Sequence, residues 1–138
     1  AAGSPRINMA NVMITLVSGN VNQVMSMYSY DVEEEDSTNA AFNGWRGISG
    51  ENGEDHGTTY FANPVQRTDN EIPWSSSNYV VAQGDLIKVT IAVDEKEEES
   101  PTIGFSQSGI IKIMPAYGQM NQINFETPES FSTKYVNL

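Results

Sequence analysis

The fold is decided by one stretch of the chain, Gln83-Gly84-Asp85-Leu86-Ile87-Lys88-Val89-Thr90-Ile91-Ala92-Val93. Apolar side chains recur in it at every second position, and a period of two is that of a strand with one buried face. Gly84-Asp85 predicts a turn before this strand, and the acidic residues 94–99 predict a solvated loop after it. The alternating set is Ile87, Val89, Ile91 and Val93.

Similar short runs recur along the chain and are separated by Gly, Pro, Asn, Asp or Ser, which is the spacing of a sandwich or barrel. We therefore predict an all-β, single-domain antiparallel β-sandwich of jelly-roll or Ig-like type, with about nine strands and little or no helix. The runs are residues 7–17, 21–32, 41–48, 58–62, 78–81, 85–93, 102–106, 109–114, 123–125 and 131–136.

The first six residues are expected to be flexible, unlike the rest of the chain. Residues 7–138 form the sandwich domain, and residues 1–6 form a flexible N-terminal arm of small residues. A strand-donating role for this arm, in which it pairs with a neighbouring subunit, is the alternative interpretation.

Composition narrows the class of partner. Eighteen acidic against seven basic residues give a net charge of −11, which repels phosphate backbones and anionic membranes. The chain has no cysteine, so disulfides, thiolate metal sites and a thiol nucleophile are excluded. We expect no nucleic acid, no membrane insertion and a protein partner. The compartment stays open, with an extracellular, cell-surface or virion location favoured.

Metal and catalytic sites have little support in the sequence. The only histidine, His56, is interpreted as an exposed loop residue, and no nucleophile motif accompanies it. No cofactor is expected, although calcium is a candidate because it takes six to eight oxygen ligands. The weak calcium candidates lie in two acidic runs and are Asp31, Glu33, Asp36, Asp94 and Glu97.

Aromatic residues in loop-like contexts are the candidates for binding. Trp45 lies beside Arg46 and between glycines, and Trp74 precedes Tyr79 in a Ser-rich segment. Such rings stack on sugars or anchor protein interfaces, whereas core packing is the competing explanation. The predicted binding residues are Trp45, Arg46, Trp74 and Tyr79. Residues 119–125 are polar enough to form an edge strand or a loop, where Met120 is a candidate interface residue.

Three functions follow from these patterns. The first is a non-enzymatic structural subunit of a virion shell, pilus or surface layer, which acts through self-association or a larger protein assembly. The second is a lectin-like carbohydrate-binding module that uses the loop aromatics and binds a glycan. The third is a hydrolase with a carboxylate pair, because the acids are numerous but their separation is not visible in a sequence.

Overall fold

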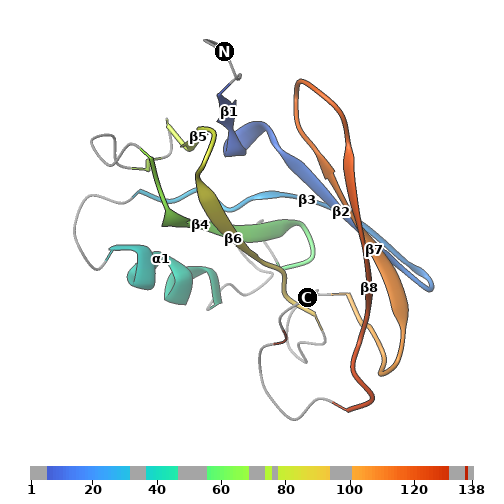
Figure 1. Cartoon of the computed structure of the whole chain (residues 1–138). Helices are drawn as coiled ribbons and strands as arrows, with labels where there is room; N and C mark the ends of the chain where they lie inside the picture. Colours follow the sequence, from blue (N-terminus) through green and yellow to red (C-terminus); the bar gives the residue numbers. More distant parts are fainter. Residues whose placement is uncertain are drawn as a thin grey trace.

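The computed structural model describes residues 6–31, 37–46, 56–68, 74–75, 78–93, 101–130 and 136. These residues form eight strands, one α-helix and one 3-10 turn (Figure 1). The elements are β1 (Ile7–Asn8), η1 (Met9–Asn11), β2 (Met13–Ser18), β3 (Val21–Met27), α1 (Ser37–Arg46), β4 (Thr59–Gln66), β5 (Val80–Val81), β6 (Leu86–Thr90), β7 (Ser108–Met114) and β8 (Asn121–Glu126).

Two sheets account for all eight strands. The larger has the order β6-β4-β3-β2-β7-β8, and β1 pairs with β5 in the smaller one. Every pair is antiparallel except β3 with β4, which run parallel and pair only through Ser26–Thr59 and Met27–Tyr60. The prediction of a mostly β, sandwich-like fold is confirmed, and this strand order now defines its topology.

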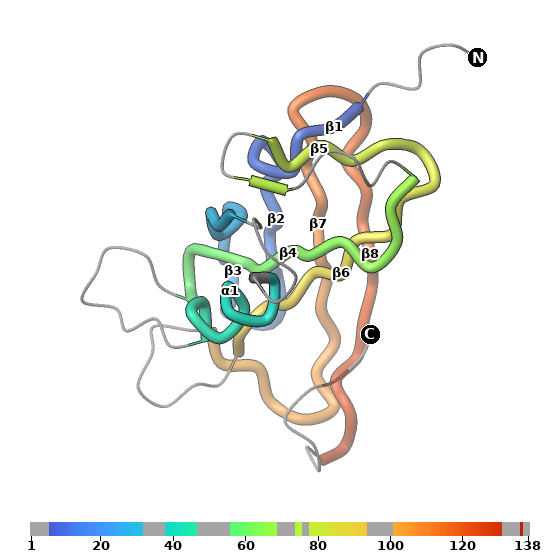
Figure 2. The backbone as a smooth tube through the Cα atoms, turned by 90° about the vertical axis from the view of Figure 1, so that its left-hand side faces the viewer, coloured from blue at the N-terminus to red at the C-terminus, as the bar shows by residue number. Residues whose placement is uncertain are grey.

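The larger sheet divides into two halves at β3. The first part of β3 pairs with β2, and its last two residues pair with β4. Beyond the strand, Tyr28 still donates its backbone N–H to the carbonyl of Tyr60 at 2.8 Å. We call β2, the paired part of β3, β7 and β8 the aliphatic half. The aromatic half consists of α1, β4 and β6 together with Tyr30, Trp74 and Tyr79, whose rings form one chain of contacts with Phe61 of β4. Figure 2 shows α1 beside β4, away from β7 and β8.

A single core joins the two halves. Ile14 and Leu16 of β2 enter it from the aliphatic half, and Tyr60 and Phe61 of β4 enter it from the aromatic half. All four side chains are at most 2% exposed. Ile14 lies opposite Met25 of β3 and Ile113 of β7 in the register, so these three residues share the inner face of the sheet.

Most predicted strands are present with shifted ends. The decisive stretch forms β6, but regular pairing ends at Thr90, and the alternating Val89 is 37% exposed because β6 is at the edge of the sheet. The run at residues 7–17 is interrupted by η1. Residues 102–106 form no strand. Residues 131–135 of the predicted strand at 131–136, the acidic loops at 32–36 and 94–99, and residues 1–5 of the arm lie outside the described residues.

The helix α1 is the main departure from the sequence prediction, which placed a strand at residues 41–48. Thr38, Ala41, Phe42 and Trp45 are less exposed than the residues between them, and they follow the i, i+3, i+4, i+7 spacing of a helix face. Thr38 is polar and Gly44 weakens a helix, so the apolar stripe was too short to be recognised. Phe42 and Trp45 pack this face against the core.

Candidate assembly surface

Three of the four predicted binding residues are core residues. Trp45, Trp74 and Tyr79 are 2%, 1% and 1% exposed. The Trp45 indole donates from Nε1 to Thr59 Oγ1 at 3.1 Å. The ring of Trp74 meets the ring of Tyr79 edge-on at 5.6 Å between centroids. A ring buried on both faces offers nothing to a sugar, so the structure assigns these three aromatics to packing rather than to ligand contact.

Of the predicted binding residues, Tyr79 is buried and hydrogen-bonded, whereas Arg46 is exposed. The Tyr79 hydroxyl accepts from the Tyr30 backbone N–H and donates to the Tyr30 carbonyl, which fixes the chain just after β3. Burial, with a smaller contribution from Tyr79, raises the pKa of the Tyr30 phenol well above its usual range. Arg46 is exposed, and its guanidinium lies 5.8 Å above the centroid of the Phe42 ring.

His56 is buried, contrary to the prediction of an exposed loop residue. Its side chain is 0% exposed, and its Nε2 lies 2.5 Å from the Trp45 carbonyl in the last turn of α1. The ring packs against that of Trp45 at 4.7 Å. The neighbouring Glu54, Asp55 and Gly57 made this segment look solvated, but the histidine satisfies a carbonyl at the helix end.

The described residues contain no cluster of three or more metal-ligating side chains. Of the calcium candidates, Asp31 is exposed at the end of β3, while Glu33, Asp36, Asp94 and Glu97 lie outside the described residues. Within the described part of the chain, no helix is long and apolar enough to cross a membrane.

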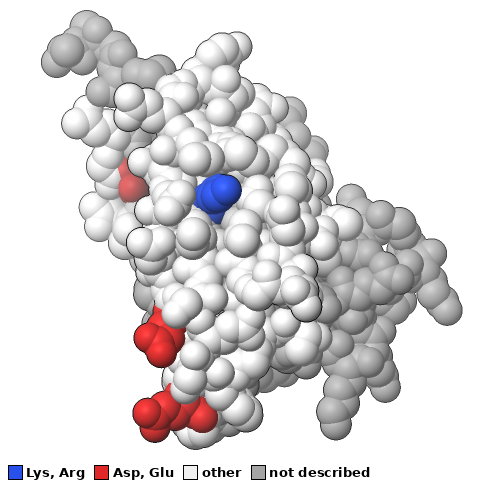
Figure 3. Space-filling view, turned by 90° about the vertical axis from the view of Figure 1, so that its right-hand side faces the viewer, with Lys and Arg blue, Asp and Glu red and all other residues white. Residues whose placement is uncertain are grey.

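The outer face of the aliphatic half is a nearly uncharged sheet surface. Its four strands hold 26 residues, of which only Lys112 and Glu126 are charged. Figure 3 looks onto this side and shows one cation within a broad uncharged area, with acids only toward one margin. We call this surface the neutral face. The register places on it Thr15, Val17, Asn22, Val24, Ile110, Lys112, Gln122 and Asn124.

Apolar side chains interrupt the polar ones across the neutral face. Val24 of β3 is 47% exposed. One row across the sheet runs from Val24 through Thr15 of β2 and Lys112 of β7 to Gln122 of β8. At the β7–β8 turn, Tyr117 and Met120 are 85% and 51% exposed. Neutral, partly apolar surface of this kind is typical of protein contacts.

β8 is the outermost strand of the aliphatic half, so of the two alternatives predicted for residues 119–125, an edge strand or a loop, the structure has the edge strand from Asn121 onward. Five of its six residues are exposed, and Ile123 is 47% exposed on the inner side of the sheet. Met120, predicted as an interface residue, lies just before this strand and is half exposed.

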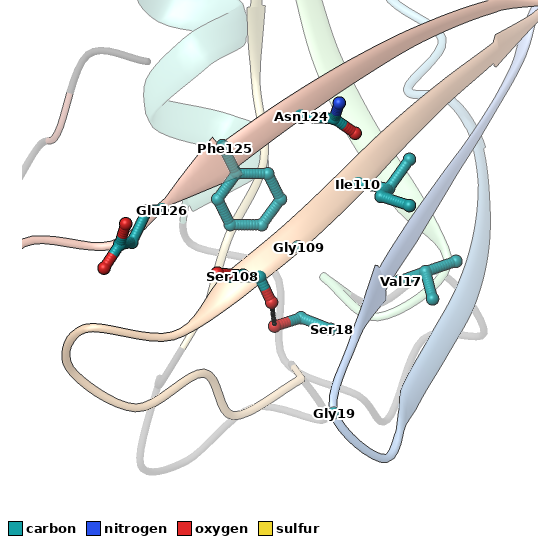
Figure 4. Close-up of a pocket in the computed structure, with 9 residues that line it drawn as sticks. All are labelled: Val17, Ser18, Gly19, Ser108, Gly109, Ile110, Asn124, Phe125 and Glu126. Atoms are coloured by element: carbon teal, nitrogen blue, oxygen red, sulfur yellow. Dashed lines mark hydrogen bonds between the residues drawn. The ribbon is translucent and has the colours of Figure 1, made fainter.

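An open hollow of about 610 Å³ lies where β2, β7 and β8 meet the β2–β3 turn (Figure 4). The Phe125 ring covers Gly109, where an added Cβ would lie 2.3 Å from its Cζ atom. Ser18 Oγ donates to the Ser108 carbonyl at 2.8 Å. Of the nine lining residues, Glu126 alone bears a charge, so the hollow offers shape and hydrogen bonds but no acid–base pair.

The architecture defines a mostly β, sandwich-like domain with one covering helix. In its fold the chain is similar to the crystal structure of archaeal flagellin FlaB1 from Methanocaldococcus jannaschii, with a TM-score of 0.62 and 19% sequence identity. The similarity covers 96% of this chain and 76% of the flagellin chain. No protein-family model and no curated protein matches the sequence. At this identity the likeness concerns the fold.

Proposed function

We propose that this protein is a non-enzymatic structural subunit that assembles with copies of itself, through the neutral face, in an extracellular filament or surface layer. The observation that carries the proposal is the neutral face itself, a sheet surface with exposed apolar side chains and with one basic and one acidic residue in four strands. Copies with a net charge of −11 repel one another as whole molecules. Contact through the neutral face brings few like charges together.

The fold supports the same proposal. A flagellin is by name a subunit of a flagellum, and a sandwich-like domain similar to one suits repeated contacts between rigid units. The same likeness supports the proposed location outside the cell.

The carbohydrate-binding alternative is less well supported. Its proposed stacking platforms, Trp45, Trp74 and Tyr79, have no exposed ring face. Arg46 is the remaining exposed member of the predicted set, and a lone guanidinium over Phe42 lacks the flat aromatic surface that a sugar ring requires. We retain Arg46 as a secondary protein contact.

Sedimentation velocity and electron microscopy over a concentration series test the proposal. We expect wild-type chains to form oligomers or filaments and the Val24→Lys variant to associate more weakly, because it places a desolvated charge in the neutral face. Val65→Lys is the matched control, since Val65 is 60% exposed on β4, outside that face. A wild-type chain that stays monomeric at every concentration contradicts the proposed function.

A further inference from the structure

We propose that β8 pairs with β8 of a second copy, antiparallel and around a two-fold axis at Ile123, to join the two sheets edge to edge. This inference rests on the proposed function, since it names one of the contacts by which copies assemble. It concerns the backbone edge of the sheet and not the neutral face.

The two outer edges of the larger sheet differ in how they are protected against pairing. The β6 edge carries the exposed Lys88 at its centre, and the ladder between β4 and β6 shifts register between Pro64 and Gln66. Charged residues and bulges are the usual devices that prevent edge association. Residues 121–125 of the β8 edge have neither device, because they hold no charged residue or proline and β8 pairs with β7 in unbroken register from Ser108–Glu126 to Ile113–Asn121; the one charge of β8, Glu126, is at its end.

The hydrogen-bond alternation identifies which backbone groups of β8 face outward. Ser26 of β3 donates its N–H to the Thr58 carbonyl at 2.9 Å, on the side of β4, so the neighbouring Met25 bonds to Ile14 of β2. Carried through the registers, this makes Thr15–Lys112 and Ile113–Asn121 hydrogen-bonded pairs. Bonded and non-bonded pairs alternate along an antiparallel ladder. Residues 121, 123 and 125 therefore bond to β7, while Gln122 and Asn124 direct their N–H and C=O groups toward the free edge.

These outward groups match those of a second copy when the strands are centred on Ile123. Gln122 then lies opposite Asn124 of the second copy, and the reciprocal pair completes four backbone hydrogen bonds. The two amide side chains of each pair stand together on the outer side. On the inner side Ile123 meets Ile123 of the second copy, and each is 47% exposed in the single chain.

The absence of charge on the β8 edge favours a second copy of β8 over a basic strand of another protein. Residues 119–125 carry no charge, so an edge from the same chain meets no like charge over that length. Glu126, the acidic residue at the end of β8, lies opposite Met120 of the second copy in this register. A basic partner strand gains nothing from an uncharged edge.

A cysteine cross-link tests the register directly, because the natural chain has no cysteine. The two Ile123 positions form a non-bonded pair, whose Cα separation of about 4.5 Å lies within the disulfide range of roughly 4.4–6.8 Å. We expect Ile123→Cys to form disulfide dimers under mild oxidation at least tenfold faster than Val65→Cys. Val65 is the control, since it is also exposed, at 60%, but lies on β4, outside the neutral face and away from the β8 edge.

Equal cross-linking at both positions indicates random collision and overturns the proposal. Cross-linking at neither position, while the wild-type chain assembles, also overturns it and leaves the proposed function standing. Wild-type chains that never assemble contradict the proposed function itself.

Two substitutions of Gln122, one of them to proline, provide a second test that does not depend on cysteine chemistry. Gln122→Pro removes an outward N–H without breaking a bond to β7, whereas Gln122→Ala removes the side chain and keeps the N–H. We expect Gln122→Pro to weaken assembly at least about tenfold more than Gln122→Ala does, because only the proline variant also removes the backbone N–H. Equal weakening by both variants assigns the contact to the side chain and overturns backbone pairing. Far-UV circular dichroism checks that both variants fold.

Discussion

The aromatic and aliphatic halves of this molecule differ in whether their large apolar side chains are buried or exposed. In the aromatic half, Phe61 packs against the rings of Tyr30, Phe42 and Trp45 at 4.9, 5.2 and 5.9 Å between centroids, and its own side chain is 1% exposed. In the aliphatic half, Val24 and Ile123 stay half exposed on an ordered sheet. The residues that look most like contact anchors therefore hold the fold together, and plain strand residues are left for contact.

The largest expected effect comes from removing the ring at the centre of the aromatic half. Phe61→Ala should lower the free energy of unfolding by about 3–5 kcal/mol, because it deletes a buried ring and leaves a cavity among its neighbours. Val24→Ala in the aliphatic half should change it by less than about 0.5 kcal/mol, since the side chain is half exposed. Urea denaturation followed by far-UV circular dichroism measures both values.

The comparison between the halves predicts the reverse order for assembly. Phe61→Ala protein that is still folded, at low temperature, should assemble like the wild type. A large loss of stability in Val24→Ala, or a small one in Phe61→Ala, means that the two halves do not divide stability and contact in this way.

The two tryptophans sharpen the comparison within the aromatic half. Trp45 donates to Thr59 Oγ1, whereas the buried Nε1 of Trp74 has no hydrogen-bond partner among the described residues. Both substitutions to Phe remove similar volume, but only Trp45→Phe also loses a hydrogen bond. Trp45→Phe should therefore be less stable than Trp74→Phe by about 1 kcal/mol, measured by thermal and urea unfolding. Equal stabilities mean that the bond to Thr59 contributes nothing net.

The strands could be predicted from the sequence, whereas the burial of the aromatic residues could not. The alternation at Gly109–Met114 and the polar edge at residues 119–125 are local signals, and β7 and β8 lie where these signals placed them. The burial of Trp45, Trp74, Tyr79 and His56 is decided by elements far away in the chain. The glycines and polar residues next to them in the sequence give no indication that these side chains are buried.

One signal for the helix was present in the sequence. The spacing of Thr38, Ala41, Phe42 and Trp45 is that of a helix face, and accepting Thr38 as a boundary residue would have revealed α1. The parallel pairing of β3 with β4, by contrast, depends on the path that α1 imposes between them, and no local pattern encodes it.

The smallest expected effect concerns the turn that begins the decisive stretch. Asp85 accepts hydrogen bonds from the Ala82 N–H at 2.9 Å and from the Thr68 N–H and hydroxyl at 2.7 and 2.9 Å. These bonds, to the backbone of Ala82 first and of Thr68 next, hold the pKa of the Asp85 carboxyl below its usual value. They tie the end of β4 to the start of β6 and so belong to the aromatic half.

Because the folded-state pKa of Asp85 is depressed, its carboxylate stabilises the fold above the unfolded-state pKa of about 3.9, and this contribution is lost as the pH falls through the folded-state value. The difference in unfolding free energy between wild type and Asp85→Asn should therefore be constant from about pH 6 to 8 and shrink below about pH 4. Urea titrations at a series of pH values measure it, with Glu129→Gln as the control because Glu129 is an exposed carboxylate outside both halves. A difference that does not vary with pH would mean that the charge of Asp85, as opposed to its shape, plays no part in closing the turn.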